Sequence, residues 1–252
     1  MDVIKRLFLI SFIIAQSVTA ANLHDVFNQG NQYYQQGEYE QAIESYQKII
    51  EEGYESGPLY FNLGNAYYKL GQLGPARLYY ERASEYLKND EALQENMQLL
   101  NLRLVDQIEP MPQFFLNAVW THVVDFIAID MLIWIVTGLL WLSLVVFSIR
   151  YYFRSRGRGD RFKILFAFIF VIFIFFALIS IQKIYNLENE QYGIIMKSSV
   201  TSRAEPKISA TEVFIIHEGT KVKIERVTGD WYEVRLADGK TGWLERTYLE
   251  II

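Results

Sequence analysis

Two long apolar runs dominate the hydropathy pattern of this chain. Residues Met131–Ile149 and Ile164–Ile181 contain no ionisable side chain, and each has about the length that crosses the roughly 30 Å hydrocarbon core of a bilayer as a helix. The twelve Leu, Ile, Val and Phe residues of the first run favour insertion by about 4–7 kcal/mol. A pair of buried core helices is the alternative. The pattern favours a transmembrane hairpin, with spans over residues 131–149 and 164–181.

The segment between the two runs is strongly basic. Residues 150–163 contain six Lys or Arg side chains and the single acid Asp160, whereas Asp125 and Asp130 precede the first run. Short loops rich in Lys and Arg stay in the cytoplasm. We therefore predict a cytoplasmic loop, with the chain before and after the hairpin on the other side of the membrane. The spans lack the ionisable residues that mark ion pathways, which favours an anchor over a transporter.

The N-terminus has the pattern of a secretory signal peptide over residues 1–20. Lys5 and Arg6 precede the apolar segment Leu7–Ile14, and the small residues Val18–Ala20 suit a cleavage site. An uncleaved anchor is the alternative, and either segment would direct the export of the repeat region. The chain contains no cysteine, which excludes a disulfide framework and a lipid-modified cysteine. These features predict a bacterial inner-membrane protein with its N- and C-terminal domains in the periplasm.

Residues 22–109 contain a 34-residue repeat. The segments FNQGNQYYQQGEYEQAIESYQKI and FNLGNAYYKLGQLGPARLYYERA superimpose after this shift, and they resemble the tetratricopeptide repeat, a helix–turn–helix unit. The repeats cover about residues 23–56 and 57–90. Glycine inside a helix costs up to about 1 kcal/mol relative to alanine, so Gly30 and Gly64 indicate a close approach of two helices. Gly37 and Gly71 are predicted to end the first helices.

A capping helix is predicted over residues 91–108, because apolar residues recur there at intervals of three or four. These residues are Leu93, Met97, Leu100, Leu104 and Ile108. A partner-binding helix is the alternative. Pro110 and Pro112 then break the chain before residues 113–130, which we predict to be an interfacial helix with Trp120 at headgroup depth.

The tetratricopeptide resemblance implies a concave protein-binding groove lined by the first helices. The side chains placed there are Phe27, Asn31, Tyr34, Phe61, Asn65, Tyr68 and Lys69. Relatives that clamp a C-terminal carboxylate carry a lysine where this chain has Phe27 or Phe61, so such a clamp is not expected. An aromatic, asparagine-lined groove suits an extended peptide. The alternative is that these side chains only pack neighbouring repeats.

Residues 184–252 alternate short β-rich runs with turn signals. Strands are predicted at Val213–Ile216, Lys221–Val227, Trp231–Leu236 and Thr241–Leu244, with Asp238-Gly239 as a hairpin turn. The segment resembles a bacterial SH3-like domain. Trp231, Tyr232 and Trp243 form a possible ligand surface, although these rings are alternatively expected to pack the barrel. Some bacterial versions bind cell-wall peptides.

No pattern predicts catalysis. The chain lacks the common nucleophile, phosphate-binding and zinc-protease motifs, and His24, His122 and His217 have no metal-ligand spacing. Residues 22–109 hold 14 acidic and 6 basic residues, and residues 184–252 hold 11 and 9. Neither region has the basic footprint of a nucleic-acid-binding protein. We therefore expect a binding protein that is not an enzyme and uses no cofactor or metal.

The predicted fold class is a multidomain membrane protein with all-α repeats, a two-helix transmembrane hairpin and a small all-β barrel. This order of modules resembles the BatE-type proteins of the Bat aerotolerance-operon family. The resemblance implies a scaffold whose partners are membrane proteins, including Bat proteins with von Willebrand A domains, and a link to a MoxR-type ATPase and stress tolerance. The alternative is a membrane protein that binds peptidoglycan through the SH3-like domain.

Overall fold

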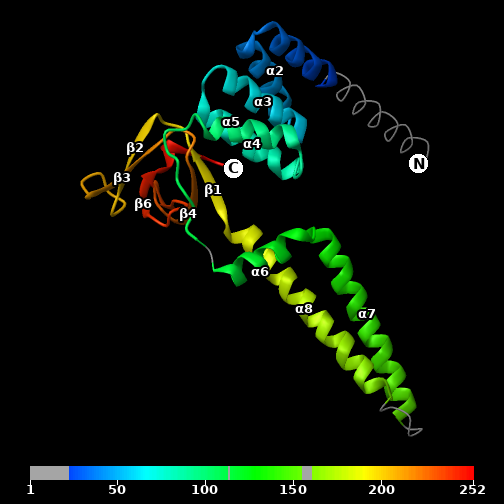
Figure 1. Ribbon diagram of the computed structural model, residues 1–252. Coiled ribbons are helices and arrows are strands. Elements are labelled where there is room, and N and C mark those ends of the chain that lie inside the picture. The colour runs from blue at the N-terminus through cyan, green and yellow to red at the C-terminus, as the bar shows by residue number, and fades with distance from the viewer. Residues whose placement is uncertain (1–22, 113, 155–160) are drawn as a thin grey trace, which may run out of the picture. The chain divides into compact units, whose positions relative to one another are not determined.

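The computed structural model describes residues 23–112, 114–154 and 161–252, which divide into two compact units (Figure 1). One unit combines the chain up to Pro110 with Gln191–Ile252, and the other comprises Met111–Glu190. N-terminal helical repeats, two apolar helices and a C-terminal antiparallel sheet confirm the predicted fold class. The predicted signal peptide and the centre of the predicted basic loop, residues 155–160, lie outside the described residues.

Paired helices form the repeat region of the first unit. Residues 23–36 are helical, and the next helices along the chain are α2 (Tyr39–Glu51), α3 (Gly57–Lys69), α4 (Leu73–Tyr86) and α5 (Glu91–Asn101). Side-chain oxygens of Ser56 and Asp90 accept the backbone N–H groups that begin α3 and α5. Gly37 and Gly71 have φ values of +81° and +76° and end the first helix of each repeat, as predicted.

The two helices of each repeat approach closely at a glycine. A Cβ atom at Gly30 would lie 2.5 Å from Cε1 of Tyr46, and one at Gly64 would clash in the same way with Cδ1 of Tyr80. Both tyrosine rings are almost completely buried in the repeat core. The predicted close approach is therefore present in both repeats.

The last helix of the repeat region is shorter than the predicted helix over residues 91–108. Helix α5 ends at Asn101, and its buried residues Leu93 and Leu100 belong to the repeat core. Leu104 instead lies beside Gly219, and Ile108 packs against the core of the sheet. The apolar spacing thus continues beyond the helix because its last members serve a second core.

The C-terminal region forms one antiparallel sheet. Its strands are β1 (Gln191–Ile195), β2 (Ser199–Arg203), β3 (Glu212–His217), β4 (Lys221–Thr228), β5 (Trp231–Arg235), β6 (Thr241–Glu245) and β7 (Leu249–Ile251), with the 3-10 helix η1 (Arg246–Tyr248) before β7. Their order in the sheet is β3-β2-β6-β5-β4-β1-β7. Alternate residues of the strands face inward, and the fully buried Ile195, Val234 and Leu244 lie in their common core.

The second unit consists of α6 (Phe115–Phe126), α7 (Ile129–Arg154) and α8 (Arg161–Asn189). Helices α7 and α8 run side by side (Figure 1). Their apolar portions, Ile129–Phe153 and Phe162–Asn186, have mean hydropathies of 2.4 and 3.2, and most of their side chains are not buried by protein. Residues 184–189 continue α8 rather than the β domain. Two exposed apolar helices of this length indicate membrane anchoring.

Candidate functional site

The residues predicted to bind a partner lie on the first helix of each repeat. Phe27, Asn31 and Tyr34 follow one another at four and three positions on the helix of residues 23–36, and Phe61, Asn65 and Tyr68 do so on α3. This spacing places each set on one helical face. All six are partly buried, and Lys69 at the end of α3 is exposed. We call the surface that carries these residues the first-helix face.

The two asparagines of this face are held by identical hydrogen-bond networks. Oδ1 of Asn31 accepts hydrogen bonds from the Tyr46 hydroxyl at 2.8 Å and from Nδ2 of Asn62 at 2.9 Å. The second network is displaced by 34 residues throughout: Oδ1 of Asn65 accepts from the Tyr80 hydroxyl at 2.8 Å and from Nδ2 of Asn96 at 2.7 Å. Asn96 lies on α5, so the hydrogen-bonding pattern of the repeats extends into a third layer.

Among the residues that the structure describes, these networks leave the amide N–H groups of Asn31 and Asn65 for another acceptor. Each side-chain oxygen receives two donors, which fixes the plane of the amide and the direction of its Nδ2 hydrogens. Burial raises the pKa of Tyr46 to about 12 and also raises that of Tyr80, so both phenols stay protonated donors near neutral pH. The first-helix face therefore holds two equivalent, oriented amide donors.

The aromatic residues of the face both pack and remain accessible. The ring of Phe27 lies 5.7 Å from that of Tyr46, and the ring of Phe61 lies 6.1 Å from that of Tyr80. The guanidinium of Arg103 lies 4.7 Å from the ring centroid of Tyr68. The packing alternative from the sequence thus applies to part of each ring, and the partly exposed remainder is available for contact.

The first-helix face continues into a third layer on α5, whose exposed residues the sequence prediction did not name. Leu99 and Leu102 of α5 and the following turn occupy the repeat positions of Asn65 and Tyr68, and they are 51% and 74% exposed. Extending the 34-residue shift into α5 would have found them. The face therefore changes from asparagine and tyrosine in its first two layers to leucine in the third.

The aromatic residues proposed for the SH3-like domain are more deeply placed. Tyr232 is 5% exposed and Trp243 is 8% exposed, whereas Trp231 is partly buried. Nε of Arg246 donates a hydrogen bond to the Tyr232 hydroxyl at 3.1 Å. Most of the area of Tyr232 and Trp243 packs the domain, which leaves Trp231 as the more accessible ring of the three.

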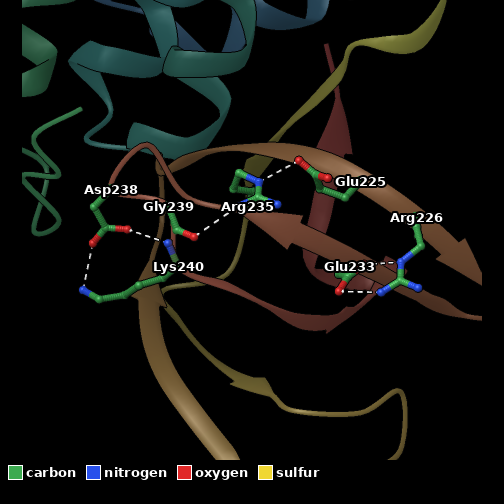
Figure 2. Close-up of polar contacts among 7 residues, drawn as sticks. All are labelled: Glu225, Arg226, Glu233, Arg235, Asp238, Gly239 and Lys240. Atoms are coloured by element: carbon green, nitrogen blue, oxygen red, sulfur yellow. Dashed lines mark hydrogen bonds and ion pairs between the residues drawn. The ribbon is translucent and has the colours of Figure 1, made fainter. Parts of the chain in front are cut away.

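Charged side chains on β4 and β5 pair with one another across the hairpin (Figure 2). Arg226 Nη2 lies 3.0 Å from a carboxylate oxygen of Glu233, and Arg235 Nε lies 2.7 Å from one of Glu225. The hydrogen bond from Arg235 lowers the pKa of Glu225. Because these four charges satisfy one another, they provide little net charge for attracting a ligand.

The turn between β3 and β4 contacts the repeats through consecutive residues. One oxygen of the Asp106 carboxylate accepts hydrogen bonds from the backbone N–H of His217 at 2.6 Å and from the Thr220 hydroxyl at 2.7 Å. Its other oxygen lies 2.8 Å from Nδ1 of His217. Burial alone would raise the pKa of Asp106, but these hydrogen bonds outweigh it and lower the pKa.

Glu218, from the same turn, caps a helix of the second repeat. Its Oε1 accepts the backbone N–H of Gly74 at 2.8 Å, in the first turn of α4. Gln72 at the N-cap position of α4 provides no side-chain hydrogen bond. A carboxylate at a helix N-terminus satisfies an unpaired N–H and interacts favourably with the helix dipole. The sheet thus supplies the cap that the repeat itself lacks.

A buried ion pair completes the contact between the repeats and the sheet. Glu81 is 7% exposed, and its carboxylate lies 2.7 Å from Nη2 of Arg77 and 2.8 Å from Nζ of Lys221. Burial alone would raise the pKa of Glu81, but the two cations outweigh it and lower the pKa. Together with the Asp106 and Glu218 contacts, this ion pair joins both regions into one unit.

Family comparisons identify both modules of this unit. Residues 33–100 match the family model for the tetratricopeptide repeat, and residues 198–250 match that for the bacterial SH3 domain. No curated protein matches the chain. Domains of these two classes are typically non-catalytic and bind proteins or, for the SH3 class, peptidoglycan, and no enzyme family is indicated.

Proposed function

We propose that this protein is a membrane-anchored scaffold that holds an extended segment of a partner protein across its first-helix face. The repeated asparagine network is the observation that carries this proposal. It orients the amide donors of Asn31 and Asn65 in equivalent positions, and backbone carbonyl groups of an extended peptide are suitable acceptors. Tyr34 and Tyr68 lie one helical turn further and offer partly exposed rings to the side chains of that peptide.

The contact between repeats and sheet supports a hairpin topology. Two helices long enough to cross a bilayer lie between these regions in the sequence. Because the His217–Lys221 turn can dock on the repeats only within one compartment, the chain between them has to cross the membrane an even number of times. Two crossings satisfy this condition. The basic loop then favours the cytoplasm, with both domains in the periplasm of a bacterial inner membrane.

The partners we propose are inferred from charge and from the sequence resemblance. The acidic repeat region favours a basic partner surface, so its binding should weaken as ionic strength rises. From the resemblance to BatE-type proteins, we propose that the partners are von Willebrand A domain proteins of the Bat family. The assembly would be a MoxR-associated complex that supports aerotolerance. Tethering both domains to one hairpin raises their effective concentration at such a complex.

Peptidoglycan binding through the SH3-like domain is a second candidate function. The match of residues 198–250 to the bacterial SH3 domain favours it. The burial of Tyr232 and Trp243 favours the repeats instead as the principal binding module. Sedimentation of the full-length protein in detergent with purified peptidoglycan separates the two proposals: we expect the protein to remain in the supernatant, and cosedimentation that is lost in Trp231→Ala would favour the cell wall.

The variant Asn31→Asp/Asn65→Asp tests the peptide proposal. Aspartate keeps an oxygen for the tyrosine and asparagine donors but has no N–H groups to offer a peptide. Peptides would be selected from a displayed random library on the full-length protein in nanodiscs, and their affinities measured by fluorescence anisotropy. We expect the variant to bind at least about tenfold more weakly, which corresponds to about 1.4 kcal/mol.

A matched control separates the loss of donors from the added charge. Asn28→Asp/Gln94→Glu adds the same two charges at exposed positions of the repeat region and leaves both networks intact. This control should bind like the unmodified protein. Equal affinities for the control and for Asn31→Asp/Asn65→Asp would count against the amide donors.

A further inference from the structure

Helix α6 has an apolar face that no protein element covers among the described residues of its unit. Phe115, Val119 and Phe126 are 65%, 56% and 90% exposed, and their spacing of four and seven positions places them on one side of the helix. His122 lies on the same side and is also exposed. An exposed apolar stripe of this kind indicates a contact surface.

The opposite side of α6 is packed against the hairpin. Val124 is 2% exposed and forms a small core with Leu132 of α7 and Ile179 of α8. The ring of Trp120 meets that of Phe175 edge to face, with centroids 6.4 Å apart. Trp120 therefore packs on α8, and the free apolar side of α6 is the one that bears Phe115, Val119 and Phe126.

Lys183 fixes the end of α6 against α8. Its Nζ donates hydrogen bonds to the backbone carbonyl oxygens of Val124 at 2.9 Å and Ile127 at 2.7 Å. These carbonyls belong to the C-terminal end of α6, where the last turn lacks intrahelical donors and a cation interacts favourably with the helix dipole. The position and rotation of α6 on the hairpin are thus determined by a specific polar contact as well as by packing.

The short connection between α6 and α7 indicates what surrounds the free apolar side of α6. Helix α6 ends at Phe126 and α7 begins at Ile129, which is also the first residue of the apolar portion of α7. If α7 crosses a bilayer, α6 therefore lies at the membrane boundary. Its 12 residues span about 18 Å, too short to cross the roughly 30 Å hydrocarbon core.

We propose that α6 lies in the lipid interface with Phe115, Val119 and Phe126 inserted at the boundary between headgroups and acyl chains. This inference rests on the proposed membrane anchoring and goes beyond the interfacial helix expected from the sequence, because it names the side of α6 that enters lipid and the residue that positions it. The free side of α6 carries no Lys, Arg, Asp or Glu among these positions, so the contact is with the apolar boundary region rather than with anionic headgroups. Lys183 acts as a positioning residue that turns this side toward lipid.

Site-directed spin labelling tests the proposal, because the chain contains no cysteine and every introduced one is unique. Val119→Cys and Phe126→Cys probe the free side, Asn117→Cys probes an exposed polar position on the other side of α6, and Leu140→Cys reports on the middle of α7. The full-length variants would be labelled in phosphatidylcholine nanodiscs, and collisions with oxygen and with a water-soluble nickel chelate compared. We expect nickel accessibility at positions 119 and 126 to be at least about threefold lower than at position 117, with oxygen accessibility high.

The other outcomes distinguish this proposal from the anchoring on which it rests. Nickel accessibility at 119 and 126 equal to that at 117, with position 140 in lipid, would overturn the α6 proposal and leave the anchor. Low accessibility to both reagents at 119 and 126 would mean that protein covers the face and would also overturn it. Free nickel access at position 140 would overturn the anchoring itself.

A second variant tests the role of Lys183. Lys183→Met removes the two hydrogen bonds to α6, and we expect a label at position 126 to become more mobile and about twofold more accessible to nickel. Lys183→Arg retains a cationic donor and should restore most of the original values. Unchanged spectra in Lys183→Met would overturn the positioning role.

Discussion

The carboxylate of Asp106 accepts the backbone N–H of His217 at 2.6 Å, although 111 positions of sequence separate the two residues. Both apolar helices lie within that separation. The contact joins the end of the repeat region to the turn between β3 and β4. It therefore makes the repeats and the SH3-like domain parts of one unit, and the two apolar helices an insertion between them.

Removing Asp106 should uncouple the two domains. Asp106→Ala deletes the acceptor for His217 and Thr220, and hydrogen bonds to a charged group contribute about 1.5–3 kcal/mol. We expect calorimetry of the full-length variant in micelles to resolve separate unfolding transitions for the repeats and the SH3-like domain, where the unmodified protein shows one. Glu109→Ala, at an exposed position nearby, should keep the single transition, and an identical result for both variants would contradict the coupling.

Replacing Gly74 with alanine should destabilise the unit, although alanine ordinarily favours a helix more than glycine does. Gly→Ala inside a helix ordinarily stabilises by up to about 1 kcal/mol. At Gly74, however, the new Cβ would lie 2.9 Å from Cγ of Glu218 and 3.0 Å from the carbonyl oxygen of Ile195. We expect the thermal midpoint to fall in Gly74→Ala and to stay level or rise in Glu85→Ala, at an exposed position of the same helix. A higher midpoint in Gly74→Ala would show that Glu218 does not dock there.

Acid should weaken the contact between the domains. Glu81 and Asp106 have pKa values lowered in the folded state, so their contribution to stability is fully present above their ordinary values of 4.5 and 3.8 and is lost as pH falls through the lowered values. The thermal midpoint should therefore be flat near neutral pH and decrease below about pH 4.5. The thermal midpoint of the variant Glu81→Gln/Asp106→Asn should fall less on acidification than that of the unmodified protein. An equally steep loss in this variant would assign acid sensitivity to other groups.

Deleting one hydroxyl should loosen one asparagine network and leave the fold intact. Tyr80→Phe keeps the buried ring but removes the donor to Oδ1 of Asn65, a change that costs about 1 kcal/mol. We expect a lower thermal midpoint and weaker binding of the selected peptides. Tyr54→Phe, at a residue that is 46% exposed, is the matched control. Equal peptide affinities in the two variants would show that orientation of Asn65 does not matter for binding.

Local patterns predicted the modules, whereas contacts between distant segments could not be predicted. The 34-residue period indicated Gly30 and Gly64 as close approaches, because the same steric requirement recurs in both repeats. It did not reveal that the oxygens of Asn31 and Asn65 are occupied within the protein, since this depends on partners in neighbouring helices. The sequence places Glu218 only between two predicted strands, because no local signal marks its contact with Gly74.

The α5 region shows why periodicity alone placed a boundary incorrectly. Leu104 and Ile108 continue the helical spacing of Leu93 and Leu100, yet they pack on Gly219 and the sheet. A one-dimensional pattern records that a residue is apolar but not which core buries it. The same limit applies to Trp120: the apolar pattern places it on a helix before the first span but does not show that its ring meets Phe175 of α8.

The side-chain amide resonances of Asn31 and Asn65 test the central proposal most directly. The full-length protein would be labelled with ¹⁵N-asparagine and ¹⁵N-tryptophan in nanodiscs, the two asparagine signals assigned through the aspartate variants, and a selected peptide added. We predict that the Nδ2 hydrogens of Asn31 and Asn65 shift downfield as they donate to the peptide, while those of the exposed Asn28 do not move. A peptide that binds and leaves both signals unchanged, or that moves the indole N–H of Trp231 instead, would contradict the first-helix face as the binding site.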